Sequence, residues 1–240
     1  MNIFSKSYFI TLEGNDLDVK NVQKLKAGDS LKLGRVEDGE DTFEITVSTP
    51  EDKMIDLLAY CDSVGTAPFI DDGSLSVQSA AVDRVDVKQG KSRAKDKTTL
   101  HFTVEYAYDE DVLYPYTQGG ISAFIPKDNI VLAMGIYHII NGGEDMVMRQ
   151  PYLNMYDMQV KLTGEMKMIL PEIDLDKGGD FYAMVLFDEK FERCRVTAKI
   201  TQGEDEFEME LSEYEKQSAL TFVNHLRIFN GETPVDCVIE

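Results

Sequence analysis

Residues 193–215 read RCRVTAKITQGEDEFEMELSEYE, and their pattern decides the class of fold. Apolar and polar residues alternate over 193–200 and again over 206–211, which is typical of two half-buried strands. The intervening Gln202-Gly203-Glu204-Asp205 supplies a turn, so the stretch predicts an antiparallel β-hairpin. The predicted pairs are Ile200 with Phe207, Ala198 with Met209 and Val196 with Leu211 on the inner face, and Lys199 with Glu208 on the outer face.

A helix is predicted directly after this hairpin. Ser212-x-x-Glu215 is a capping box, and Asn230-Gly231 supplies a stop. The apolar residues between them that recur at helical spacing are Ala219, Phe222, Val223, Leu226 and Phe229. Seven acidic residues lie within 204–215. Because several of them belong to the outer face of a paired strand, they do not by themselves indicate a metal site.

The C-terminal half contains a second predicted helix. Residues 130–140 form the longest apolar run, Asp128 precedes it as a candidate cap, and Asn141-Gly142-Gly143 follows it. The pattern predicts a short buried helix with His138 in the core or in a groove. The methionines of this half are interpreted as core; they include Met134, Met146, Met148, Met155 and Met158.

The first half predicts further antiparallel strands. Residues 30–36 and 43–47 flank a turn that contains an Asp-Gly pair, which is typical of a hairpin. Ser48-Thr49-Pro50-Glu51 then resembles a helix start, so residues 54–61 favour a helix, with a buried strand as the alternative. Residues 79–87 and 98–108 alternate as strands, and His101 falls on the outward face of the second one.

These elements define the fold class and the domain organisation. We expect an α+β fold of mainly antiparallel sheets built from β-hairpins, with an OB-like or barrel-like first part, a few short helices and a C-terminal capped helix. The acidic run 109–111 and the Pro- and Gly-containing segment 114–120 interrupt the periodicity. The predicted junction therefore lies near residue 112, between a β-rich domain 1–112 and an α+β domain 113–240.

The charge of the chain restricts its partners. Its 240 residues include 24 Lys and Arg against 44 Asp and Glu, a formal net charge of −20. Such a charge disfavours nucleic acid and anionic membranes, which are bound through clustered basic residues. The exception is a basic cluster made of Lys88, Lys91, Arg93, Lys95 and Lys97. This cluster is interpreted as the solvated tip of a hairpin or as a local contact for an anionic ligand.

Localisation and redox state follow from simpler signals. The first residues, MNIFSK, lack the basic segment and apolar core of a signal peptide, so a cytoplasmic protein is expected. The apolar run 130–140 is too short to cross a bilayer, and no membrane association is predicted. Cys61, Cys194 and Cys237 are odd in number and far apart in sequence, so they are interpreted as reduced thiols.

The motifs of catalysis and metal binding are incomplete. Gly90-Lys91-Ser92 resembles the end of a phosphate-binding loop, but Val85 stands where that loop requires glycine. Residues 174–180 place carboxylates and a glycine as a calcium loop does, yet Val185 occupies the position of its bidentate glutamate. The chain has three histidines, and none has a ligand partner at metal spacing. We therefore expect no metal, no cofactor and no catalytic residue that the sequence can name.

One stretch resembles a known family. Residues 25–38 read LKAGDSLKLGRVED and precede Ile45-Thr46-Val47. This order of a Leu-x-x-Gly element, a strand, an acidic loop and an aliphatic strand resembles the opening of HIRAN domains. Asp71-Asp72-Gly73 before the strand at 80–87 is similar to a later part of that family. The resemblance covers residues 25–108, and the chain departs from the family pattern at Gly39-Glu40-Asp41 and at Ile55-Asp56-Leu57.

The resemblance implies a function as well as a fold. HIRAN modules are small barrel-like domains, some of which bind single-stranded DNA ends, so a non-catalytic recognition domain is implied. We expect a non-enzymatic binding module that recognises a protein partner, or a nucleic-acid end, through the first domain. The alternatives are an enzyme of another family, such as a metal-dependent hydrolase, and an assembly subunit that uses the tyrosines of segments 114–116 and 152–156.

Overall fold

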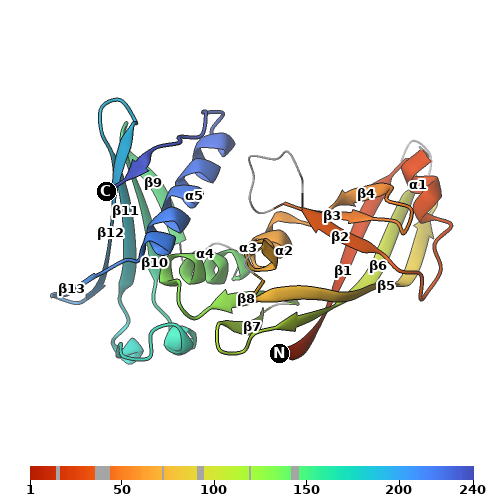
Figure 1. Ribbon diagram of the computed structural model, residues 1–240, viewed down its shortest axis with the longest axis horizontal. Coiled ribbons are helices and arrows are strands. Elements are labelled where there is room, and N and C mark those ends of the chain that lie inside the picture. Colours follow the sequence, from red (N-terminus) through yellow and green to blue (C-terminus); the bar gives the residue numbers. More distant parts are fainter. Residues whose placement is uncertain (15–16, 36–43, 72, 91–94, 119, 142–145) are drawn as a thin grey trace. The chain divides into compact units, whose positions relative to one another are not determined.

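The structure is a computed structural model that describes residues 1–14, 17–35, 44–71, 73–90, 95–118, 120–141 and 146–240 (Figure 1). The chain divides into two compact units. Unit 1 comprises Met1–Thr117 and Ile121–Phe124, and unit 2 comprises Gln118–Gly120 and Ile125–Glu240. The units change over between residues 117 and 125, whereas the sequence predicted a junction near residue 112. Both units consist mainly of antiparallel strands with a few short helices, which confirms the predicted α+β class.

Unit 1 contains a three-stranded sheet with the order β1-β6-β5. Its strands are β1 (Asn2–Glu13), β5 (Leu75–Lys88) and β6 (Lys97–Tyr108). The strands predicted at 79–87 and 98–108 are confirmed as parts of β5 and β6, while β1 was not predicted. Four apolar side chains of β6 are fully buried as expected, namely Leu100, Phe102, Val104 and Tyr106. Residues of opposite parity, His101 included, lie on the other face.

A second three-stranded sheet of unit 1 corrects one prediction. Its strands are β2 (Lys32–Arg35), β3 (Ile45–Ser48) and β4 (Met54–Leu57). The hairpin of β2 and β3 was predicted, but the helix over 54–61 is wrong. The Thr49 N–H donates to the Lys53 carbonyl at 2.9 Å, and Asp52 has a left-handed φ of 62°. This turn reverses the chain, so β4 pairs with β3 and buries Ile55.

The remaining elements of unit 1 are short. They are α1 (Leu17–Val22), α2 (Tyr60–Val64), α3 (Ala67–Asp71) and the paired strands β7 (Leu113–Gln118) and β8 (Ile121–Pro126), the last of which continues into unit 2. An isolated bridge between Ser30 and Ala81 connects the region before β2 to β5. Among the described residues, the strand pairings do not close the two sheets into a barrel.

Unit 2 is a six-stranded sheet with helices on one face. Its strand order is β13-β12-β11-β10-β9, and β14 pairs in parallel with β12. The strands are β9 (Met146–Tyr152), β10 (Met155–Lys161), β11 (Asp180–Phe187), β12 (Arg193–Gln202), β13 (Asp205–Met209) and β14 (Val238–Ile239). The helices are α4 (Ile130–Ile140) and α5 (Glu213–Phe229), with 3-10 turns η1 (Gly164–Met168) and η2 (Leu175–Lys177).

The hairpin of β12 and β13 has the predicted register. Ile200 faces Phe207, Ala198 faces Met209 and Lys199 faces Glu208. The predicted pair of Val196 with Leu211 is wrong, since β13 ends at Met209 where the chain begins its approach to α5. The inner face of this edge strand is less covered than expected, because Phe207 is 44% exposed.

The capping box of α5 is confirmed. The Ser212 hydroxyl accepts from the Glu215 N–H at 3.3 Å, and the Glu215 carboxylate accepts from the Ser212 N–H at 2.8 Å. The predicted apolar stripe holds only in part. Phe229, the last residue of the helix, is 87% exposed, and Arg227, one turn after Val223, donates to Tyr156 of the sheet.

Helix α4 is confirmed with a different cap. Asn129, and not Asp128, accepts from the Leu132 N–H at 2.9 Å through its side-chain oxygen. The same buried amide donates to the Ser218 hydroxyl at 2.9 Å, which ties the start of α4 to α5. Gly135 permits the close approach of the two helices, because a Cβ atom there would overlap the Phe222 ring. Local propensity favours Asp128 and Asn129 equally as caps, and the contact with α5 selects Asn129.

Candidate binding surfaces

The predicted basic cluster lies at the end of the β5–β6 hairpin. Lys88 closes β5, Lys97 opens β6, and the two residues are direct partners in the ladder. Lys95 is exposed between them, and Lys91 and Arg93 fall outside the described residues. The structure therefore places three of the five predicted residues at one hairpin end.

Part of this basic charge is neutralised within the chain. The Lys97 ammonium lies 2.7 Å from the Glu13 carboxylate of β1, and this bond holds the pKa of Glu13 below its usual value. Asp96 organises the turn, since its carboxylate accepts from the Gly90 N–H at 2.8 Å and its carbonyl accepts from the Gly14 N–H at 2.9 Å. These contacts fit a polar hairpin end that is held to β1.

The acidic segment 174–180 is a turn that precedes β11. The Asp174 carboxylate pairs with the Lys177 ammonium at 3.6 Å. The Gln202 side chain donates to the carbonyls of Asp174 and Gly178 at 2.8 and 2.6 Å. In the parts of the chain that the structure describes, no three His, Cys, Asp or Glu side chains are arranged to hold a metal ion. The segment is therefore fixed by Gln202 and Lys177.

His101 takes part in a polar cluster on the outer face of the β1-β6-β5 sheet. Its Nε2 lies 3.1 Å from the Asp86 carboxylate, which also accepts from Arg84 Nε at 3.1 Å. Arg84, followed by His101, holds the pKa of Asp86 below its usual value. Phe9 lies next to the imidazole and is 71% exposed. The cluster is internally paired and lies on an exposed sheet face.

The outer face of the unit 2 sheet forms a groove. Apolar side chains of the inner face, such as Val185, pack against Phe222 and Val223 of α5, so the helix covers only one side of the sheet (Figure 1). The groove on the opposite side has a volume of about 750 Å³. Its lining includes Arg149, Asp157, Met184, Arg195, Lys199 and Glu208, which come from five neighbouring strands.

The floor of this groove is apolar at its centre. Met184 of β11 lies between Asp157 of β10 and Thr197 of β12 in the strand register. Tyr182 follows on the same face, and the Lys199 ammonium lies 5.9 Å from the centroid of its ring. Met184 and Tyr182 are half-buried, so both remain accessible. A thioether and a phenol ring at this position offer adaptable apolar contact to a bound side chain.

Charged side chains surround this apolar floor. Arg149 forms a two-point ion pair with Asp157 at 2.9 and 3.1 Å, and this pair raises the pKa of Arg149. Lys199 lies 2.8 Å from Glu206 of β13, whose hydrogen bond raises the pKa of Lys199. Arg195 is exposed and forms no ion pair with any residue that the structure describes.

The charges are ordered along the groove. Arg195 precedes Lys199 by four residues on the same face of β12, about 13 Å along the strand. The acidic side chains of β13 lie beside Lys199, at the opposite end from Arg195. One end of the groove is therefore basic and the other acidic. This arrangement was not predicted, because it depends on which strands become neighbours; the alternating faces of β12 and β13 were the available signal.

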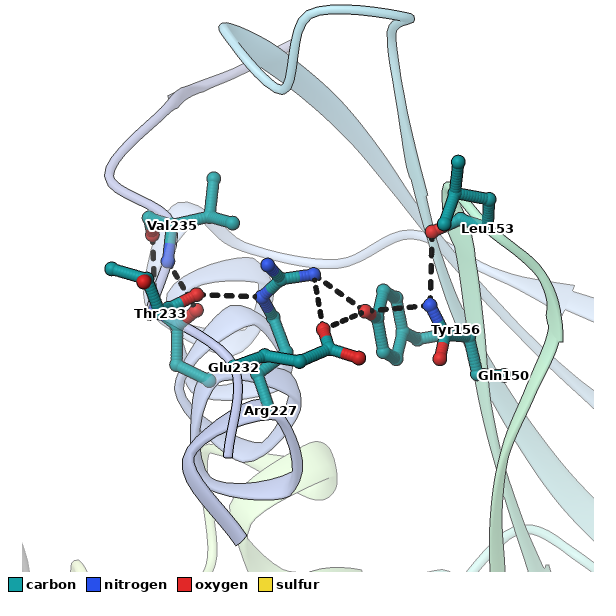
Figure 2. A network of polar contacts seen from close by, with 8 residues as sticks. Gln150, Leu153, Tyr156, Arg227, Glu232, Thr233 and Val235 are labelled. Carbon is teal, nitrogen blue, oxygen red and sulfur yellow. Dashed lines mark hydrogen bonds and ion pairs between the residues drawn. The ribbon is translucent and has the colours of Figure 1, made fainter. Parts of the chain in front are cut away.

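A hydrogen-bonded network lies on the helix side of the same sheet (Figure 2). The buried Tyr156 hydroxyl accepts from Arg227 at 2.6 Å and from Gln150 at 2.9 Å, and it donates to Glu232 at 3.3 Å. Arg227 also pairs with Glu232 at 2.9 Å and donates to the Thr233 carbonyl at 2.9 Å. Burial raises the pKa of Tyr156, and Arg227 opposes this shift.

This network is a structural clamp. It connects the end of α5 to β9, to β10 and to the segment that follows the helix. The Asn224 side chain extends it by exchanging two hydrogen bonds with the backbone of Val235, at 2.9 and 2.8 Å. Because the donors and acceptors at its centre bond one another, the network leaves little polar capacity for a ligand.

Unit 1 has a buried polar cluster of its own. Lys6 of β1 is 3% exposed and lies 3.2 Å from the Asp62 carboxylate of α2. Its ammonium is 4.6 Å from the centroid of the Tyr8 ring, and the hydroxyls of Tyr8 and Tyr106 are hydrogen-bonded at 2.8 Å. Burial, reinforced by Tyr106, raises the pKa of Tyr8 well above its usual value, and burial also raises that of Tyr106.

The fold and these surfaces define a two-unit α+β protein in which one sheet face carries an uncovered, charge-ordered groove. A scan of protein-family models, a search of curated proteins and a search of solved structures each found no match to the chain. None of the helices in the described segments combines the length and the apolar character that a membrane span requires.

Proposed function

We propose that the chain is a non-enzymatic binding protein that recognises a protein partner through the groove of unit 2. The observation that carries this proposal is the groove itself, which has about 750 Å³ of space on a sheet face that α5 does not cover. Arg149 and Lys199 each engage a carboxylate, an arrangement that suits recognition better than proton transfer. The proposal keeps the predicted class of function but transfers the site from the first domain to unit 2.

The order of charges indicates the partner segment. An acidic side chain fits Arg195, apolar side chains fit the floor at Met184, and a basic side chain fits the end formed by Glu206 and Glu208. Arg149, Arg195 and Lys199 balance the three acidic side chains of the lining, so the groove is neutral within a chain of net charge −20. An extended chain spans roughly 3.3 Å per residue, so a partner segment that reaches from Arg195 to the acidic end has five or six residues. Its acidic, apolar and basic positions follow in that order.

Selection from a random-peptide display library tests this proposal. We expect the 240-residue chain to enrich peptides with this order of charges. Their affinity should fall at least about tenfold in Arg195→Glu and in Met184→Lys, because each substitution removes one complementary contact. Lys190→Glu is the matched control, since Lys190 is an exposed cation of unit 2 outside the groove lining. Peptides that bind the wild type and the three variants with equal affinity would contradict the proposal. A selection that enriches no peptide with this order of charges would contradict it as well.

A further inference from the structure

The fold brings together two cysteines that are distant in sequence. Strand β14 pairs in parallel with the start of β12, so that Cys194 faces Ile239. The Glu240 N–H donates to the Cys194 carbonyl at 2.9 Å, and the Val238 N–H donates to the Glu192 carbonyl at 3.0 Å. This pairing places Cys237 beside Cys194, and the two thiols are close enough to influence each other's pKa values.

The environments of the two thiols differ. Cys194 is buried on the inner face of β12, whereas Cys237 is half-buried in the segment after α5, and both are free thiols. Burial, followed by the contact with Cys237, raises the pKa of Cys194 to about 12. Burial also raises the pKa of Cys237. Cys237 is the one that an oxidant can reach first, because it is only half-buried, and it reacts as the thiolate.

We propose that Cys194 and Cys237 form a disulfide with a disulfide oxidant of the oxidised-glutathione class, and that this bond clamps the C-terminal segment to β12. The Cys237 thiolate attacks one sulfur of the oxidant and releases one glutathione thiolate. The Cys194 thiolate then attacks the Cys237 sulfur of the mixed disulfide and releases the second glutathione. The two thiol protons pass to the two glutathione thiolates, so one oxidant is reduced for each disulfide formed.

The disulfide would strengthen the attachment of strand β14, which has few anchors of its own. Strand β14 has two residues, and its outer ion pair of Arg193 with Glu240 is exposed at 3.1 Å. The disulfide closes a ring over residues 194–237, which contains α5 and the segment held by Arg227. Closing a ring of this size restricts the unfolded chain and stabilises unit 2. This inference goes beyond the proposed function and does not depend on groove binding.

Mass spectrometry of the 240-residue chain in glutathione buffers of increasing oxidised fraction tests the inference. We expect the wild type to become lighter by two hydrogen atoms, with peptide mapping assigning the bond to Cys194 and Cys237 and dithiothreitol reversing it. Cys61→Ser is the matched control, because it removes the thiol of unit 1 and should leave the bond unchanged. Cys237→Ser and Cys194→Ser should both prevent it.

Thermal unfolding supplies the second measurement. Oxidation should raise the Tm of the wild type and of Cys61→Ser by roughly 5 °C or more, and it should not raise the Tm of Cys237→Ser. Cys237→Ser keeps the test valid if Cys194→Ser, a change in the core, does not fold. If all three thiols of the wild type can still be alkylated at the highest ratio of oxidised to reduced glutathione, the inference is overturned. A bond that involves Cys61, or a glutathione adduct that persists on Cys237 in the wild type, would overturn it as well.

Discussion

The two units bury a cation in different ways. In unit 1, Lys6 points inward from the middle of β1 and is 3% exposed, and Asp62 is its carboxylate partner. In unit 2, Arg227 lies at the end of α5 with 13% exposure, and it distributes its donors over Tyr156, Glu232 and the Thr233 carbonyl. A buried ammonium beside a carboxylate is more sensitive to loss of that partner than a guanidinium with several acceptors is to loss of one of them.

Asp62→Ala should produce the largest change in stability. Removing the carboxylate leaves the buried Lys6 ammonium without this counter-charge, which we expect to destabilise unit 1 by about 3–5 kcal/mol. Urea unfolding would measure the loss. The double variant Lys6→Met/Asp62→Ala should recover most of it, since the charge that needed compensation is gone. A single variant that unfolds with the wild-type midpoint would remove the distinction between the two units.

Arg227→Met should destabilise unit 2 by a smaller amount, about 1.5–3 kcal/mol. The substitution keeps much of the aliphatic packing but leaves the Tyr156 hydroxyl and the Thr233 carbonyl with one donor fewer. Denaturant unfolding, monitored with a spectroscopic probe placed in unit 2, would measure this loss of stability. Tyr156→Phe tests the same network from the sheet side, and it should cost less because the pair of Arg227 with Glu232 remains. A loss as large as that of Asp62→Ala would contradict the comparison.

Alkaline pH should weaken unit 1 through Tyr8 and Tyr106. Their pKa values in the folded chain lie above the ordinary value of about 10, so the folded state retains protons that the unfolded state releases. Stability from these phenols is fully present below pH 10 and is lost as the pH rises above it. Phenolate absorbance with parallel denaturant melts would measure this. Tyr8→Phe should flatten the decline, and an equal decline in that variant would exclude the mechanism.

The basic cluster of unit 1 should give the smallest effect. We expect weak binding of single-stranded DNA at low salt that disappears at physiological salt, because the net charge of −20 opposes phosphate contact. Fluorescence anisotropy would measure it. The variant Lys88→Glu/Lys91→Glu/Arg93→Glu/Lys95→Glu should abolish the low-salt signal. Saturable binding at physiological salt with a preference for single strands would instead support the HIRAN resemblance and favour unit 1 as the recognition surface.

The sequence predicted the elements whose signals are local. The register of Ile200 with Phe207 and the capping box of Ser212 and Glu215 are both confirmed. Strand alternation and helix capping involve residues within a few positions of each other, so both can be predicted from the local sequence without the rest of the fold. The chemistry of capping was less decisive at α4, where Ser218 of a distant helix selects Asn129 over Asp128.

Tertiary structure decided the features that depend on distant partners. Residues 54–57 carry a pattern that fits a helix or a strand, and pairing with β3 makes them a strand. The inward direction of Lys6, the meeting of Cys194 with Cys237 and the order of charges in the groove all require strands or helices from elsewhere in the chain. The free energy of each depends on burial and pairing between segments far apart in sequence, whereas periodicity reports only which residues share a face.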